Sequence, residues 1–128
     1  MKTKMIWANF AVDNLDRTTD FYSSLGFKSN GRSDELTSFF FGENEFVIHF
    51  FLKDALEKNT NLSFSNNQNS NEIIFSMLAE TKDEVDQWAE SVRKAGGKIE
   101  SEPKEFGDNY YGFVFSDPDG HKFNIFIM

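Results

Sequence analysis

The chain ends in Asp117-Pro118-Asp119-Gly120-His121-Lys122-Phe123-Asn124-Ile125-Phe126-Ile127-Met128, a tight turn that leads into a strand. The proline fixes φ at the second position of the turn, and the glycine tolerates a positive φ at its close. Along the strand Phe123 and Ile125 share one face, while Asn124 lies in the middle of the other. We therefore expect one face to be buried and the amide of Asn124 to point away from the core.

Periodicity upstream of this stretch predicts the same order of elements twice. The second helix is the best defined, because Thr81 and Glu84 form a capping box and Gly96-Gly97 stop the apolar stripe that follows. In the first half we expect strand, helix and three strands over residues 5–12, 14–25, 27–30, 36–41 and 45–52. In the second half we expect the same series over residues 72–77, 82–95, 98–102, 110–116 and 121–128.

Such a repeat predicts an α+β protein made of two βαβββ modules whose curved mixed sheets enclose a pocket. The polar stretch 57–71 contains only Leu62 and Phe64 as apolar residues, so we interpret it as a linker or mobile loop. The expected organisation is a single domain over residues 1–128, with one module over 1–56 and the other over 72–128.

Superposing the two modules sets Trp7 opposite Glu72 and His49 opposite Asn124. The neighbours of these residues in each strand are apolar, so all four are expected on the sheet faces that the helices do not cover. If the sheets curl toward each other, those faces line a concave pocket.

Composition and charge exclude several classes of partner and site for this chain. The protein has 128 residues, a net charge of −8 and no cysteine, so it lacks thiolate metal ligands and a cysteine nucleophile. Its acidity argues against nucleic acid, and no apolar run is long enough for a membrane. Without a secretory signal in its first residues, we expect a cytoplasmic protein whose ligand is a neutral or cationic small molecule.

Several motifs of the chain carry a family resemblance: Phe10 to Arg17, Asp20-Phe21-Tyr22, Leu25-Gly26-Phe27, Ala95-Gly96-Gly97 and Asp117 to His121. With them the chain resembles, over nearly its whole length, the vicinal oxygen chelate superfamily of glyoxalases, bleomycin resistance proteins and extradiol dioxygenases. It looks most like the small bacterial glyoxalase-like members. The resemblance implies the fold described above and a homodimer whose pocket is built from paired modules.

The resemblance also implies a divalent metal held by one ligand from each of four strands, usually His, Glu, His and Glu. Here the matching positions hold Trp7, His49, Glu72 and Asn124. Trp7 cannot ligate a metal, and Asn124 offers only a neutral carbonyl. His49 and Glu72 make up half of a usual site for nickel, zinc, manganese or iron. We therefore expect a degraded metal site and favour a protein without a metal cofactor, with a divalent metal as the alternative.

Three functions remain open at this point. The first is a protein that binds a small aromatic or cationic molecule, through Trp7, Asn9, His49, Phe51, Glu72, Tyr110 and Asn124. The second is a metal-dependent lyase, isomerase or dioxygenase-like enzyme. In it His49 and Glu72 act as metal ligands or as an acid-base pair. The third is a non-catalytic interaction module whose pocket is filled by its own aromatic side chains. His121, beside the turn, is expected to face solvent.

Overall fold

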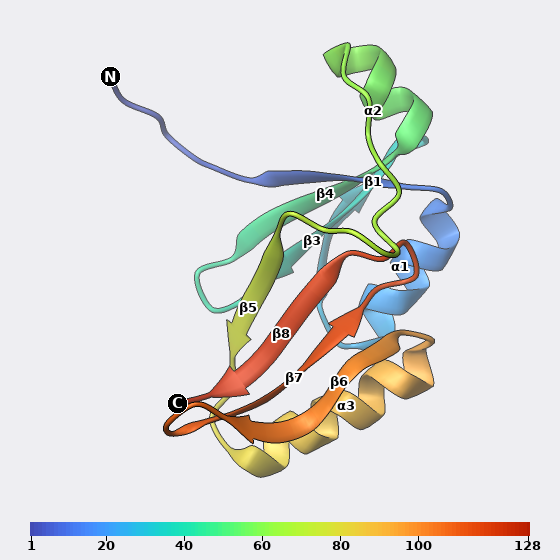
Figure 1. Ribbon diagram of the computed structural model, residues 1–128. Coiled ribbons are helices and arrows are strands. Elements are labelled where there is room, and N and C mark those ends of the chain that lie inside the picture. The colour runs from blue at the N-terminus through green and yellow to red at the C-terminus, as the bar shows by residue number, and fades with distance from the viewer. The chain divides into compact units, whose positions relative to one another are not determined.

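The computed structural model describes residues 1–128, which divide into two compact units, Met1–Ser65 and Asn66–Met128. The first unit contains β1 (Ala8–Val12), α1 (Leu15–Ser24), β2 (Lys28–Arg32), β3 (Leu36–Phe41), β4 (Phe46–Leu52) and α2 (Lys53–Thr60) (Figure 1). The second unit contains β5 (Ile74–Leu78), α3 (Lys82–Ala95), β6 (Lys98–Phe106), β7 (Tyr110–Ser116) and β8 (Lys122–Ile127). The predicted order of strand, helix and three strands is confirmed in both units.

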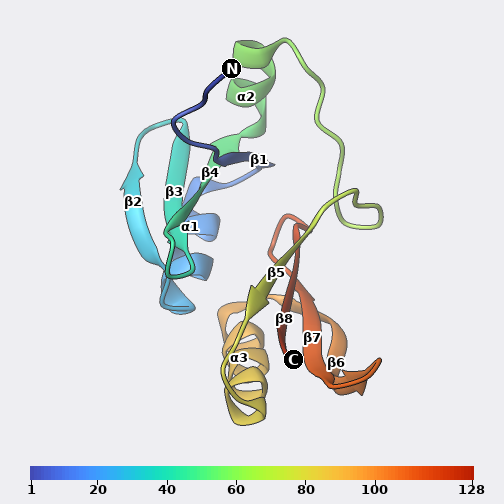
Figure 2. The ribbon, with the colours of Figure 1, turned by 90° about the vertical axis from the view of Figure 1, so that its left-hand side faces the viewer.

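Each unit is built on one open, mixed sheet of four strands. The strand order is β1-β4-β3-β2 in the first sheet and β5-β8-β7-β6 in the second. In both sheets the first strand pairs in parallel with the last, and the other neighbours are antiparallel. Figure 2 shows α1 along one face of the first sheet and α3 along one face of the second. None of the helices is long and apolar enough to cross a membrane.

Aromatic rings form the core of the first unit. Asn14 caps α1 by accepting a hydrogen bond from the backbone N–H of Arg17 at 2.9 Å. The helix buries Tyr22 completely, and its ring stacks on Phe50 of β4 at 4.6 Å between centroids. Phe39 of β3 lies 5.7 Å from the same tyrosine ring. Such aromatic contacts fix the side of the first sheet on which α1 packs.

Aliphatic residues of α3 form the core of the second unit together with rings from the sheet. Thr81 caps the helix by accepting a hydrogen bond from the N–H of Glu84 at 3.1 Å, as the capping box predicts. The buried residues of the helix are Val85, Ala89 and Val92. They lie on the face of the sheet that carries Phe113, Phe115, Phe123 and Ile125, all nearly inaccessible to solvent.

The helix α2 departs from the predicted linker. Residues 57–60 were expected to form no element, but they are the second half of this helix, so that part of the prediction is wrong. One apolar side chain is enough to anchor it, since Leu56 is only 3% exposed and the helix contacts β4 and β1. Asn61 ends the helix in a left-handed conformation, and the Glu57 carboxylate accepts a hydrogen bond from the Phe64 N–H at 2.8 Å.

The turn between β7 and β8 is organised by Asp117, as expected, but it also buries a histidine. One carboxylate oxygen of Asp117 accepts hydrogen bonds from the N–H groups of Asp119 at 3.0 Å and His121 at 2.8 Å. The other lies 2.8 Å from Nδ1 of His121, whose side chain is 2% exposed. The expectation that His121 faces solvent is therefore wrong, because the carboxylate holds its ring inside the turn.

The segment that precedes β5, residues 67–71, is held against this turn by hydrogen bonds. Lys122 donates hydrogen bonds from Nζ to the carbonyl oxygens of Gly120 at 2.6 Å and Asn67 at 3.1 Å. The amide of Asn71 donates to the Gly120 carbonyl at 3.0 Å. The backbone of Asn67 passes so close that a Cβ added to Gly120 would lie 2.7 Å from its carbonyl group. Glycine is thus needed here both for its positive φ of 91° and for space.

A matched pair of glycine substitutions separates these two requirements. Gly42, in the turn between β3 and β4, has a φ of 76° but nothing within 4 Å of an added Cβ. We expect Gly42→Ala to lower the free energy of unfolding by about 1–2 kcal/mol, the cost of a left-handed alanine. Gly120→Ala should lower the free energy of unfolding by about 1–3 kcal/mol more, because the backbone at Asn67 must move away from the added Cβ. Urea denaturation measures both, and equal losses would show that the close approach at Gly120 does not matter.

Candidate functional site

His49 of β4 lies on the open face of the first sheet. Its neighbours Ile48 and Phe50 are 0% exposed and belong to the core under α1. Because side chains alternate along a strand, His49 points to the opposite face. The strand register pairs it with Asn9 of β1 and with Ser38 of β3, which therefore share this face.

A chain of hydrogen bonds runs across this face to His49. The amide nitrogen of Asn30 donates to Oγ of Ser38 at 3.1 Å, and the same oxygen lies 2.7 Å from Nδ1 of His49. Ser38 is completely buried, whereas Asn30 is exposed in a bulge of β2 where the register shifts between Ser29 and Gly31. The bulge turns the Asn30 side chain toward Ser38.

Aromatic rings flank His49 on two sides. The Trp7 ring meets the imidazole edge to face at 6.0 Å, and the Phe51 ring does so at 6.0 Å with an interplanar angle of 87°. The Trp7 side chain is 48% exposed, so much of its surface is open to solvent. Farther along this face, the Lys28 ammonium lies 5.4 Å from the centre of the Phe40 ring.

Burial sets the protonation of His49. The ring is half-buried, and this desolvation lowers its pKa from the ordinary value of 6.5. The neutral imidazole therefore prevails at pH 7. It is suited to hydrogen bonding or proton uptake, and less to pairing with an anion.

Asn124 occupies the corresponding face of the second sheet. Its amide nitrogen donates to Oγ of Ser76 on β5 at 3.4 Å, and Val114 of β7 is its partner on the other side. Tyr110 lies at the end of the same face, where its ring stacks on Phe106 at 5.6 Å. Asn124 and Tyr110 are thus exposed to the same side of this sheet, as the alternation predicted for Asn124.

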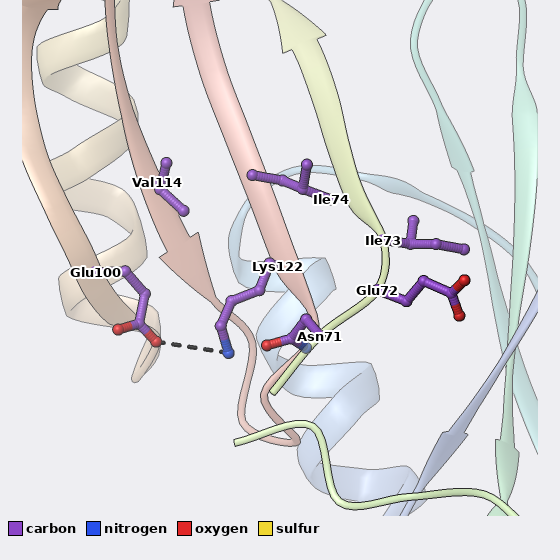
Figure 3. A pocket seen from close by; sticks show the side chains of 7 residues that line it. All are labelled: Asn71, Glu72, Ile73, Ile74, Glu100, Val114 and Lys122. Carbon is purple, nitrogen blue, oxygen red and sulfur yellow. Dashed lines mark ion pairs between the residues drawn. The ribbon is translucent and has the colours of Figure 1, made fainter. Parts of the chain in front are cut away.

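Glu72 borders an open pocket of about 310 Å³ in the second unit. Its other lining residues are Asn71, Ile73, Ile74, Glu100, Val114 and Lys122 (Figure 3). Figure 3 shows the Glu72 carboxylate turned away from the ion pair between Glu100 and Lys122, whose charged atoms are 3.6 Å apart. A hydrogen bond from Ser116 at 2.5 Å, together with the nearby lysines, lowers the pKa of Glu100.

The register revises the predicted equivalence of Trp7 and Glu72. His49 pairs with Asn9 in the first sheet, and Asn124 pairs with Ser76 in the second. Counting back two residues from each partner makes Ile74 the equivalent of Trp7. Glu72 precedes β5 by two residues and is not part of the sheet. This count takes the predicted matching of His49 with Asn124 as its starting point.

The donor set does not fit a metal centre within either unit. His49 has a serine and an amide as its polar neighbours on the face, and Asn124 has a serine. Neither unit gathers three or more His, Cys, Asp or Glu side chains around a common point. Nickel, zinc and iron sites require three or four such ligands.

Sequence reasoning missed Ser38 and Asn30. Alternation alone could have placed Ser38 opposite Phe39 and Phe41, on the open face. Its contact with His49 follows from the β3–β4 register, and that of Asn30 follows from a bulge that no local pattern marks.

Comparisons with known proteins place the chain among related folds. The model of the Glyoxalase/Bleomycin resistance protein/Dioxygenase superfamily matches residues 4–125. A search of curated proteins finds no significant match. Among solved structures, a hypothetical protein from S. aureus is similar with a TM-score of 0.88 and 28% identity, over 100% of this chain and 96% of that one.

Two further solved structures share the fold at lower identity. A glyoxalase-related enzyme from Fulvimarina pelagi has a TM-score of 0.85 and 19% identity, over 98% of this chain and 89% of that one. A lactoylglutathione lyase from Agrobacterium tumefaciens has a TM-score of 0.69 and 18% identity, over 99% of this chain and 96% of that one.

The lowered pKa of His49 predicts how stability depends on pH. Between its folded pKa and 6.5, the unfolded chain binds more protons at His49 than the folded chain does. The free energy of unfolding should therefore fall as the pH is lowered from 7 through 6.5. We expect His49→Gln to weaken this dependence in urea denaturation series. An NMR titration of the wild-type ring with a midpoint at or above 6.5 would contradict the prediction.

Proposed function

Because the chain belongs to the Glyoxalase/Bleomycin resistance protein/Dioxygenase superfamily, we propose that it binds a small aromatic or cationic molecule on the open face of its first sheet, without a divalent metal. The observation that carries the proposal is the position of His49, whose ring contacts those of Trp7 and Phe51 and whose Nδ1 lies 2.7 Å from Oγ of Ser38. This arrangement combines apolar surface with one oriented polar group, as ligand sites do.

Aromatic and electrostatic features support such a guest. The exposed indole of Trp7 offers a face for a planar ring or for a cation. The net charge of −8 raises the local concentration of cations and disfavours polyanions. Since His49 is neutral at pH 7, it does not repel a cation that approaches the tryptophan.

Other polar residues on the open faces have a proposed part in recognition. Asn9 pairs with His49 across β1 and β4, so a ligand that reaches the imidazole also reaches this amide. In the second unit, Asn124, Tyr110 and Glu72 are proposed contacts for a ligand on that sheet. An amide donates and accepts, which suits it to reading a polar substituent.

The proposal leaves the protein without metal-dependent chemistry. A lyase, isomerase or dioxygenase that used His49 and Glu72 as ligands would need further strong donors. The remaining family positions hold Trp7 and Asn124, and the hydrogen-bond partner of His49 in the first unit is Ser38. The same residues are sufficient for binding a small molecule, which requires no further metal ligands.

Ligand titrations with defined probes test the proposal. Phenethylamine is an aromatic cation, and 2-cyclohexylethylamine has the same charge on a saturated ring. With EDTA present in both titrations, we expect phenethylamine to bind more tightly than 2-cyclohexylethylamine. Phenethylamine should also perturb the NMR signals of Trp7 and His49. Trp7→Ala should weaken its binding about two- to tenfold, because a ring contact is lost.

Ile6→Ala is the matched control, since Ile6 is the exposed neighbour of Trp7 and its loss removes apolar surface without removing a ring. This variant should bind as the wild type does. Equal affinity for both amines, or binding that EDTA abolishes, would contradict the proposed function.

A further inference from the structure

We propose that Asn30 and Ser38 are positioning residues that hold His49 in the tautomer with its proton on Nε2, so that the ring offers a hydrogen-bond donor to an acceptor oxygen of the ligand. Such an oxygen belongs to a carbonyl group, which accepts a hydrogen bond without carrying a negative charge. The ligand half of this inference rests on the proposed function, whereas the tautomer is a property of the protein without ligand.

Asn30 decides which group donates and which accepts in this chain of hydrogen bonds. Its amide nitrogen can only donate, and it points at Oγ of Ser38 at 3.1 Å. The serine oxygen accepts this bond and has one proton of its own to give. Its remaining partner is Nδ1 of His49 at 2.7 Å, and Ser38 is 0% exposed, so water does not take the proton instead. Ser38 therefore donates to Nδ1.

A neutral imidazole has one protonated and one unprotonated nitrogen. When Nδ1 accepts from Ser38, the proton must be on Nε2. Burial lowers the pKa of His49, which favours this neutral form over the imidazolium. Nε2 makes no hydrogen bond within the first unit, so its N–H is available to a ligand.

The surroundings of His49 contain nothing that would draw the proton to Nδ1. On its face of the sheet, β1 presents Asn9 and β4 presents Val47 and Phe51, while Trp7, just before β1, contacts the imidazole ring. The charged group on this face is Lys28 of β2, above the Phe40 ring. No carboxylate takes part, and a cation disfavours a second proton on the ring.

The inferred tautomer also bears on the family's metal position. A protonated Nε2 has no lone pair to give a metal ion. It can bind an oxygen acceptor, and the rings of Trp7 and Phe51 on either side suit an aromatic body attached to that oxygen. The ligand class that fits is an aromatic carbonyl compound or a related oxygen acceptor.

The tautomer is measured by NMR on protein labelled with ¹⁵N-histidine, since the shift of each ring nitrogen reports whether it carries a proton. The chain has two histidines, and His121 serves as the internal reference. We expect an unprotonated Nδ1 in His49 of the wild type. Asn30→Asp replaces the donor by an acceptor of the same shape at an exposed position, so Ser38 should turn its proton toward the carboxylate and the imidazole proton should move to Nδ1.

Asn9→Asp is the matched control for this change. It places the same charge on the same face, on the strand that does not contact Ser38, so it should leave the proton on Nε2. A wild-type proton on Nδ1 would overturn the positioning roles, and so would an Asn30→Asp spectrum identical to that of the wild type. A role in folding alone would not move the proton between nitrogens.

The ligand half is tested with acetophenone and its isostere α-methylstyrene, which lacks the oxygen. We expect acetophenone to bind about two- to tenfold more tightly, because it gains a hydrogen bond, and to shift the Nε2 signal. Equal binding would overturn the donor role toward the ligand. If neither probe shifts any signal, the donor role fails together with the proposed function, but the tautomer experiment still decides the roles of Asn30 and Ser38.

Discussion

Side-chain alternation along β4 is the constraint on which the candidate site depends. Ile48 and Phe50 are fully buried on the α1 side, so His49 must lie on the other face. A shift of the strand by one residue would expose both apolar side chains, at about 1.5–3 kcal/mol each, and would bury the imidazole without Ser38. The same constraint acts in β8, where Phe123 and Ile125 are buried and Asn124 is turned outward. Core packing in each unit therefore places one polar residue at an equivalent point of each open face.

Most of the fold could be predicted because its signals are local. The capping box at Thr81 and the apolar stripe after it define α3, and the turn at Asp117 defines the start of β8. The βαβββ order follows from these elements and their repetition. The short helix α2 was missed because Leu56 is its single buried side chain, which is too weak a pattern to recognise. His121 was misplaced because its burial depends on a carboxylate four residues away, not on the periodicity of the strand.

The site was predictable only in part, for a physical reason. Alternation identifies which residues share a face, and it identified His49 and Asn124. It does not give the partners across strands, which depend on register and on the bulge at Asn30. The start of β5 was taken two residues too early, so Glu72 was matched to Trp7 where the register has Ile74. The polar partner of His49 thus turned out to be Ser38, and the roles proposed for Glu72 remain predictions.

His49 lies at a position where the family resemblance implies a metal ligand, and there its Nδ1 contacts Ser38, which in turn accepts a hydrogen bond from the Asn30 amide. We propose that this face binds its ligand without a metal ion. Elemental analysis of untagged protein, after dialysis against nickel, zinc, manganese and iron salts and removal of the excess, tests it most directly. We expect metal far below one atom per chain in the wild type, and the same low content in His49→Ala. Stoichiometric metal that is lost in both His49→Ala and Glu72→Ala would contradict it.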